Sequence, residues 1–217
     1  FQDILAYADV PRDRILVTSE ALRVKQIYVE PQAERLYRPC YDPTYLDRLD
    51  AHAERMLGPS TPSGGAFVSR AGMFARFAGE SYIETVMAKA GLRIVRPEDL
   101  PLLDQLRAYR NHEQVIFSEG SALHAPQFLG HSLARIDVFR REEGSNLNAP
   151  VLRPRCKSLN YWSFLRGSIE MLGPTNTPWR IYALSAIDPD AFLEVMRTID
   201  VPVDRFWNAA EFKEVQT

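Results

Sequence analysis

Residues 66–128 read AFVSRAGMFARFAGESYIETVMAKAGLRIVRPEDLPLLDQLRAYRNHEQVIFSEGSALHAPQF, and this stretch decides the fold. Its apolar runs and helical spacings predict, in order, a strand, a polar turn, a helix, a strand, a helix, a strand and a turn that opens another helix. Such alternation indicates a mostly parallel sheet with helices on both faces. Ligands of these sheets bind beyond the carboxyl ends of the strands. Polar residues follow two of those ends, at Ser69-Arg70 and at Ser118-Glu119-Gly120-Ser121, so we expect a binding site there.

The same patterns extend the expected sheet along the chain. Strands are expected at 14–18, 24–29, 66–69, 92–95, 114–117, 136–139 and 180–184. Helices are expected at 43–57, 80–90, 102–109, 122–129, 161–171 and 189–199. A crossing loop is expected at 31–45, and the glycine- and proline-rich residues 58–65 indicate either a hinge or an ordinary surface loop. These elements predict a Rossmann-like α/β fold.

Composition restricts the class of protein. The 217 residues suit one α/β domain, or one domain with part of another, and 46% hydrophobic with 25% charged residues indicates a folded core. A net charge of −2 gives no support for a nucleic-acid-binding protein, whose domain is usually basic. Arginine supplies 22 of the 26 basic residues, and either phosphate recognition or a GC-rich genome accounts for this bias.

The cysteines and the chain ends bear on the cellular setting. Cys40 and Cys156 match no metal-binding or redox spacing, which favours a reduced, cytoplasmic setting, with one disulfide as the alternative. No apolar run approaches the length of about 18 residues that spans a bilayer, and no signal peptide is evident. Phe1 to Ala8 have the apolar spacing of a helix interior, so we expect the chain to be part of a longer protein.

Several short motifs, taken in order, give the stretch a family resemblance. They are Ser69-Arg70, Arg76, Gly79-Glu80, GLRIVRPEDL at 91–100, Gln105 and VIFSEGSAL at 115–123. Together they resemble glycosyltransferase family 61, the group that contains bacterial capsular polysaccharide biosynthesis proteins. The resemblance implies the C-terminal half of a GT-B glycosyltransferase. It assigns 1–65 to the end of an N-terminal Rossmann-like region with its hinge, and 66–217 to a C-terminal nucleotide-sugar-binding domain.

The resemblance gives the first strand end a role in binding the donor. In the family, basic residues at the positions of Arg70 and Arg76 contact the nucleotide diphosphate, and Ser69 is placed to donate to the same oxygens. A guanidinium suits this role because its fork of N–H donors matches phosphate oxygens. The alternative for both arginines is a solvated surface position in an arginine-rich chain.

Three further residues are expected to support the site. Glu80 holds the family's Glu position and is expected to order the site by pairing with an arginine, although a glutamate also suits a helix N-terminus. The family's Asn before it is replaced by Gly79. Glu98 and Gln105 match positions where the family keeps an acid and a Gln, and helix capping or packing is the alternative for each.

The turn after the third strand is the sharpest local motif. Gly120 allows a tight turn, and the N–H groups of Ser121 and Ala122 are expected to form an anion-binding helix start. Many family members have His-Gly-Ala here. A carboxylate at Glu119 cannot stabilise phosphate charge as a protonated His does, but it can accept hydrogen bonds, so Glu119 is expected to orient ribose or sugar hydroxyls rather than bind the diphosphate. His124, near the first helical turn, is a further donor-binding candidate. A purely structural turn is the alternative.

No metal and no cofactor are expected. The histidines lack partners at metal-ligand spacing, and no Asp-x-Asp pair is expected at a strand end. This favours stabilisation of the leaving group by arginine and by helix N–H groups. The catalytic base has no candidate, and the resemblance implies that it lies in the N-terminal half.

These expectations combine into one functional hypothesis. The protein is expected to move a sugar, with inversion, from a nucleotide diphosphate donor to a bacterial surface polysaccharide of capsular or lipopolysaccharide type. It is expected to act in the cytoplasm at the inner face of the membrane, with peripheral membrane or capsule-assembly partners, and to be inactive as an isolated piece. Two alternatives stay open, a different polysaccharide-modifying enzyme such as a pyruvyl transferase, and a non-catalytic nucleotide-binding or assembly module.

Overall fold

The computed structural model describes residues 2–29, 34, 43–173 and 175–216. The crossing loop expected at 31–45 lies largely outside these residues, and Cys40 lies outside them. Cys156 is a free, half-buried thiol.

Five parallel strands form the central sheet, in the spatial order β3-β1-β4-β5-β6. Their bounds are β1 (Gly65–Val68), β3 (Arg93–Val95), β4 (Gln114–Ser118), β5 (Leu133–Phe139) and β6 (Cys156–Trp162). From β1 the chain passes to β3 on one side and then returns to β4 on the other. The winding therefore reverses between β1 and β4, which is where doubly wound sheets bind their ligands.

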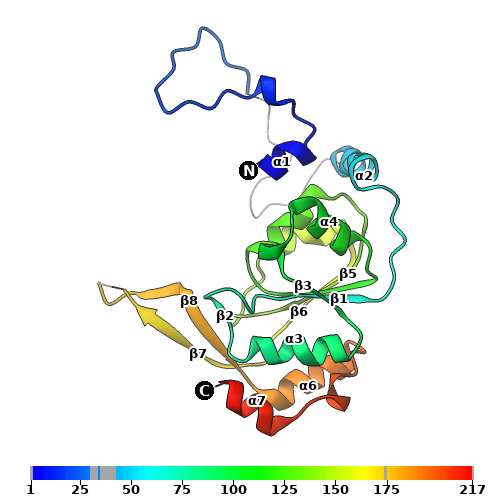
Figure 1. Ribbon diagram of the computed structural model, residues 1–217, viewed down its shortest axis with the longest axis vertical. Coiled ribbons are helices and arrows are strands. Elements are labelled where there is room, and N and C mark those ends of the chain that lie inside the picture. The colour runs from blue at the N-terminus through cyan, green and yellow to red at the C-terminus, as the bar shows by residue number, and fades with distance from the viewer. Residues whose placement is uncertain (1, 30–33, 35–42, 174, 217) are drawn as a thin grey trace.

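Helices cover both faces of this sheet (Figure 1). On one face lie α3 (Glu80–Lys89), α6 (Pro189–Thr198) and α7 (Ala209–Gln216), and on the other lie α1 (Gln2–Tyr7), α2 (Pro43–Leu57) and α4 (Leu102–Arg110). Successive strand residues pack into opposite cores, Phe67 and Ile116 into the first and Val68 and Phe117 into the second. The predicted Rossmann-like α/β fold is confirmed. None of the described helices is long and apolar enough to span a bilayer.

A second, smaller sheet stands at the carboxyl end of the central one. Its strands lie in the order β2 (Arg76–Phe77), β8 (Pro178–Ile187) and β7 (Leu165–Leu172). β2 runs parallel to β8, and β7 pairs antiparallel with β8 in a hairpin that projects from the rest of the molecule (Figure 1). The remaining elements are η1 (Arg12–Arg14), η2 (Pro97–Asp99), η3 (Ser121–Phe128), α5 (Ala149–Leu152), η4 (Arg153–Arg155) and η5 (Val203–Arg205).

The two strands expected near the start of the chain are wrong. After η1, residues 15–29 form neither helix nor strand, and Val17 and Tyr28 are 84% and 83% exposed. β-Branched residues favour a strand when neighbouring side chains pack against them. The part of the chain that the structure describes places no partner strand beside this segment.

The helix expected at 161–171 is also wrong, because β6 ends at Trp162 and β7 begins at Leu165. Polar Arg166, Ser168 and Glu170 recur every second residue there, which is strand periodicity. The Leu, Glu and Met residues of this segment favour helices and hide that pattern. The expected helix at 122–129 is the 3₁₀ helix η3, which contains a proline.

Candidate functional site

The carboxyl ends of β1 and β4 border a cavity of about 310 Å³, called here the donor cavity. It is lined by Ser69, Arg70, Met73, Pro97, Glu98, Gln105, Ser121, Ala122 and Ala125. These residues come from the segments that follow β1, β3 and β4, and all of them lie within residues 66–128. The cavity therefore lies where the winding of the sheet reverses, and most of its polar residues are ones that the sequence singles out.

A buried carboxylate ties the two strand ends together. Glu80, which is 1% exposed, accepts hydrogen bonds from the Ser118 hydroxyl at 2.5 Å and from the backbone N–H of Arg70 at 2.7 Å. Its other oxygen accepts the N–H of Phe77 at 2.9 Å. Burial raises the pKa of Glu80, and these hydrogen bonds partly offset that effect. The expected pairing with an arginine takes the form of a hydrogen bond to the backbone of Arg70, while the charge of the Arg70 guanidinium acts on Glu80 without a hydrogen bond.

Arg70 brings a positive charge to the donor cavity. It is 8% exposed, and its Nε donates to the carbonyl of Ala75 at 2.9 Å. Among the described residues, no acceptor engages its terminal nitrogens. The guanidinium lies against Gly120, where any Cβ would overlap it. Gly120 has a φ of 166°, an extended conformation open to any residue, so glycine is required here for space rather than for a tight turn.

Gln105 and Glu98 form the wall opposite β4. The Gln105 amide donates to the carbonyls of Pro97 and Leu100, at 2.8 and 2.9 Å, and so fixes η2. The Glu98 carboxylate lies over Gly72, where a Cβ would come within 2.6 Å of its Oε1. Both residues line the cavity, and their contacts within the protein give them a shaping role.

Glu119 is engaged by the segment that follows β5. One of its carboxylate oxygens accepts the N–H of Arg141 at 2.9 Å, and the other accepts the hydroxyl of Ser145. Its carbonyl accepts the Nε of Arg141 at 2.7 Å. These contacts fix Arg141 beside the turn, and the expected role of Glu119 toward sugar hydroxyls stays a prediction.

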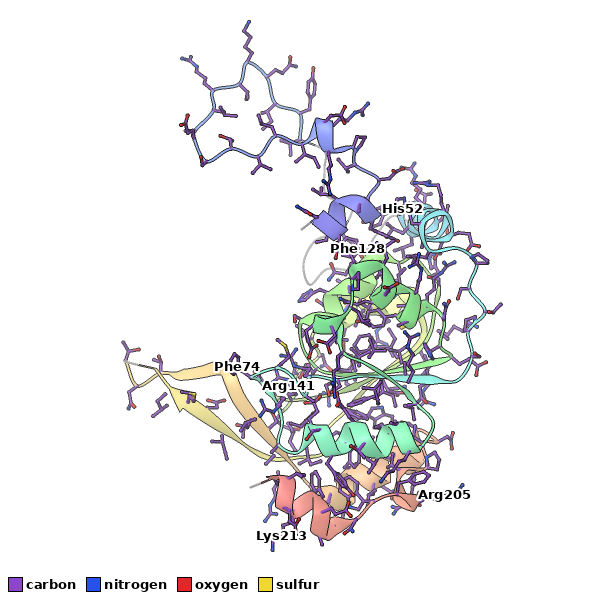
Figure 2. The ribbon with its side chains drawn as sticks, viewed as in Figure 1. His52, Phe74, Phe128, Arg141, Arg205 and Lys213 are labelled. Atoms are coloured by element: carbon purple, nitrogen blue, oxygen red, sulfur yellow. The ribbon has the colours of Figure 1, made fainter. Side chains whose placement is uncertain are left out.

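Arg141 is a cation that the sequence reading missed. Figure 2 places it at the end of the sheet from which the β7–β8 hairpin projects. Burial lowers the pKa of Arg141, and burial followed by the charge of Arg141 lowers the pKa of Arg70. The charges of nearby carboxylates, those of Glu80 and Glu119 among them, act in the opposite direction on both arginines. None of them hydrogen-bonds to the terminal nitrogens of Arg70 among the described residues, so the pair of guanidinium groups in a largely buried setting favours a bound anion. A signal was available, because Arg140-Arg141 follows β5 just as Ser69-Arg70 follows β1.

Comparison with known families assigns the chain to one of them. The family model for glycosyltransferase 61 matches residues 1–132, more than half of the sequence. The chain belongs to glycosyltransferase family 61. All the donor-site residues predicted for this glycosyltransferase fall inside the matched part, whereas Arg141 and the β7–β8 hairpin fall outside it. No curated protein matches the sequence.

Five predicted donor residues of the glycosyltransferase are not among those that line the donor cavity: Glu80, Glu119 and Gly120, described above, and Arg76 and His124. Arg76 is in β2, and its Nη1 donates to the carbonyl of Met73 at 2.7 Å. His124 is exposed on η3, where its Nδ1 accepts from the side-chain amide of Asn148 at 2.8 Å. Neither is among the residues that line the cavity, although Arg76 holds the backbone of one that does.

Gly79 explains the departure from the family's Asn. It begins α3 with a φ of 78°, in the left-handed region, and the ring of Phe212 packs closely against its Cα. Glycine and asparagine are the residues that adopt this conformation most readily. Glycine also leaves room for the Phe212 ring, which a Cβ would meet at 2.8 Å, and the turn aims Glu80 at the strand ends.

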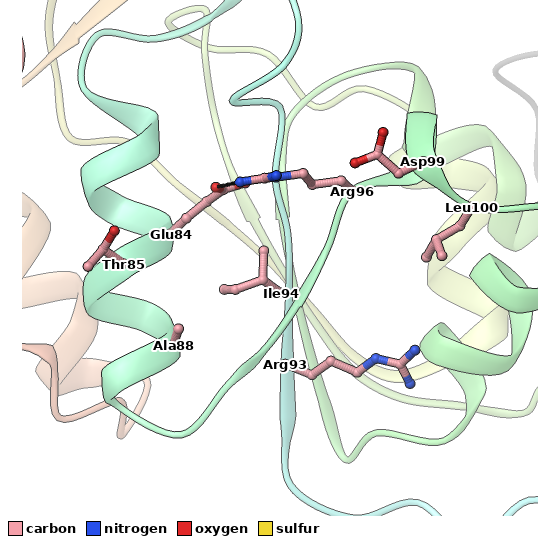
Figure 3. Close-up of a pocket in the computed structure, with 8 residues that line it drawn as sticks. All are labelled: Glu84, Thr85, Ala88, Arg93, Ile94, Arg96, Asp99 and Leu100. Atoms are coloured by element: carbon pink, nitrogen blue, oxygen red, sulfur yellow. Dashed lines mark hydrogen bonds and ion pairs between the residues drawn. The ribbon is translucent and has the colours of Figure 1, made fainter.

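A larger cavity of the glycosyltransferase, about 490 Å³, lies along the edge strand β3 and is called here the edge cavity (Figure 3). Inside it, Arg96 donates to both oxygens of Glu84, from Nε at 2.9 Å and from Nη2 at 2.5 Å. Burial raises the pKa of Glu84, but the hydrogen bonds of Arg96 and Ser69 and the charge of Arg96 outweigh it and lower the pKa overall. Since this guanidinium already has a carboxylate partner, the edge cavity is not the candidate site.

The described residues contain no cluster of three or more His, Cys, Asp or Glu side chains that could hold a metal ion. An Asp-x-Asp sequence does follow the end of β8, at Asp188-Pro189-Asp190, but its first aspartate has a structural role. Oδ1 of Asp188 accepts the N–H groups of Asp190 and Ala191, each at 3.0 Å. Asp188 therefore caps the start of α6.

Proposed function

We propose that this glycosyltransferase binds a nucleotide diphosphate sugar at the donor cavity and transfers the sugar to a polysaccharide. One observation carries the proposal. A largely buried arginine lines a cavity at the reversal point of an α/β sheet, and no carboxylate of the described residues binds its terminal nitrogens. A buried cation without a carboxylate partner is suited to an anionic ligand.

The groups around Arg70 suit a diphosphate. The hydroxyl of Ser69 is held at the cavity wall by the N–H of Ala71 at 3.0 Å. The N–H groups of Ser121 and Ala122 open η3, and the first N–H groups of a helix have no partner inside it. Arg76 holds the carbonyl of Met73 at the cavity wall, so we assign it a positioning role rather than contact with the diphosphate.

The transfer is a single displacement with inversion. A general base takes the proton of the acceptor hydroxyl as its oxygen attacks the anomeric carbon, the bond from that carbon to the diphosphate oxygen breaks, and the nucleoside diphosphate leaves with the electron pair. Negative charge grows on the leaving oxygen, where Arg70 and the N–H groups of η3 stabilise it without reorganising. Glu80 does not take the hydroxyl proton, because both of its oxygens already accept protein hydrogen bonds.

The family also supports an acceptor and a setting. Its bacterial members include capsular polysaccharide biosynthesis proteins, so we propose a surface polysaccharide of capsular or lipopolysaccharide type. Such chains are built from nucleotide sugars, so we propose that the reaction takes place in the cytoplasm at the inner face of the membrane.

The test is a calorimetric screen of the protein against UDP-, GDP-, CMP- and dTDP-sugars. Arg70→Ala removes charge-assisted hydrogen bonds worth roughly 1.5–3 kcal/mol, so affinity should fall about ten- to hundredfold. Arg70→Lys should restore part of it, since an ammonium keeps the charge but loses the planar fork. The exposed Arg48→Ala on α2 is the control. Unchanged binding by Arg70→Ala at fixed salt overturns the proposal.

A further inference from the structure

We infer that the sugar nucleotide spans two cavities, with its nucleoside in the donor cavity and its sugar in a polar cavity against the β7–β8 hairpin. This inference rests on the proposed function. The second cavity, called here the hairpin cavity, measures about 490 Å³, within the usual range of ligand sites. It is lined by Arg141, Glu142, Glu143, Leu165, Arg166, Gly167, Ser168, Glu170 and Ala183.

The peptide between Glu119 and Gly120 joins the two cavities. Arg70, which lines the donor cavity, lies against the Cα of Gly120. Arg141, which lines the hairpin cavity, donates from Nε to the carbonyl of Glu119 at 2.7 Å. The two guanidinium groups therefore stand at one peptide, each at the border of its own cavity. A diphosphate placed there contacts both cations and leaves its nucleoside and its sugar on opposite sides.

The two cavities differ in chemistry as the two ends of a sugar nucleotide do. The donor cavity includes apolar groups from Met73, Pro97, Ala122 and Ala125, which suit the flat face of a base. The hairpin cavity offers carboxylates, guanidinium groups and a hydroxyl, which suit a ring of sugar hydroxyls.

The hairpin is also fixed to Arg141. The hydroxyl of Ser185 in β8 donates to the carbonyl of Arg141 at 2.8 Å. In β7, Arg166, Ser168 and Glu170 recur at every second position and all line the cavity. Ile169 lies between them and is 71% exposed. The strand thus offers a polar cavity wall and a matched control position.

The experiment compares three kinds of probe, namely inorganic pyrophosphate, the nucleoside diphosphates UDP, GDP and dTDP, and the nucleotide sugars UDP-glucose, GDP-mannose and dTDP-glucose. Calorimetry measures each with the parent and with Arg141→Ala, Ser168→Ala, Glu170→Ala and the control Ile169→Ala. Arg205→Ala, in η5 and well apart from Arg141 in Figure 2, controls for loss of a cation.

Arg141→Ala should weaken all three kinds of probe by about tenfold or more, because it removes a charge-assisted contact to the diphosphate. Ser168→Ala and Glu170→Ala should weaken only the nucleotide sugar, by about two- to tenfold, which is the range for one hydrogen bond. Both controls should bind every probe as the parent does.

Three results overturn the inference in distinguishable ways. If the hairpin variants bind the nucleotide sugar as tightly as the parent, the hairpin cavity does not hold the donor sugar. If Arg141→Ala binds pyrophosphate as the parent does, the arginine pair is not a diphosphate clamp. If the parent binds pyrophosphate but binds neither the nucleoside diphosphates nor the nucleotide sugars, the proposed function itself fails.

Discussion

The donor cavity and the edge cavity each contain an arginine near a buried glutamate of α3, yet the two sites are built differently. In the edge cavity, Arg96 donates both of its hydrogen bonds to Glu84, and the charges neutralise each other. Beside the donor cavity, Glu80 binds backbone N–H groups and a hydroxyl, and Arg70 is held by a carbonyl. The larger volume of the edge cavity is therefore a poor guide to function. A buried cation that no carboxylate binds through hydrogen bonds is the better guide to function.

The largest expected effect is the loss of stability on Glu80→Ala. The change leaves the N–H groups of Arg70 and Phe77 and the hydroxyl of Ser118 buried without their acceptor. Unsatisfied buried donors cost about 1–3 kcal/mol each, so the free energy of unfolding should fall by about 3–5 kcal/mol. Urea denaturation measures it, with Ser118→Ala as the milder control. A loss below about 1 kcal/mol contradicts the assigned network.

The next prediction contrasts Arg96→Ala with Arg70→Ala, since one arginine is expected to support stability and the other nucleotide binding. Arg96→Ala leaves the carboxylate of Glu84, 5% exposed, without its partner and should reduce the free energy of unfolding by about 1–3 kcal/mol. Nucleotide affinity should stay unchanged. Arg70→Ala should do the reverse, with weaker nucleotide binding and little change in stability. Paired urea and calorimetry experiments check both variants, and a drop in nucleotide affinity for Arg96→Ala would erase the contrast between the cavities.

A smaller effect is expected at Gly120. Its extended backbone accepts any residue, so Gly120→Ala should not strain the chain, but the new Cβ displaces the guanidinium of Arg70. Nucleotide affinity should fall by about three- to tenfold, less than for Arg70→Ala, since the charge remains nearby. Gly144→Ala, in a loop where a Cβ would have no atom within 4 Å, is the control for stability. Its left-handed φ of 72° should reduce stability without changing affinity.

Much of the central sheet could be predicted because residues 66–139 alternate between apolar strands and amphipathic helices. The strand-end rule then places Ser69, Arg70, Ser121 and Ala122 together, since parallel strands present their carboxyl ends at one edge. What the rule cannot supply is the direction of a side chain. Glu119 follows its strand as predicted, but its carboxylate turns to the segment after β5.

The failures have two physical causes. Residues 14–29 carry strand-forming side chains, but pairing depends on a partner strand that the described residues do not place beside them. In the β7–β8 hairpin, helix-favouring residues occupy positions whose polar pattern has a period of two. Arg141 was missed because it lies beyond residue 132, where the family pattern ends, although the strand-end rule covers it equally well.

The smallest expected effect is an opposite pH dependence of the two glutamates. The pKa of Glu84 is lowered, so its contribution to stability is present above its unfolded pKa near 4.5 and is lost as pH falls through its folded pKa. The pKa of Glu80 is raised, so its contribution is present below about 4.5 and is lost as pH rises through its folded pKa.

Urea denaturation of Glu80→Gln, Glu84→Gln and the parent between about pH 3.5 and 7 measures this difference. The stability difference between parent and variant should rise with pH for Glu84 and fall with pH for Glu80, each by at most about 1.4 kcal/mol per pH unit. Both carboxylates are nearly buried and lie one helical turn apart on α3. Burial alone would therefore give both profiles the same sign, so opposite slopes isolate the guanidinium that binds Glu84 and does not bind Glu80. Slopes of the same sign would mean that the ion pair of Arg96 with Glu84 does not form in solution.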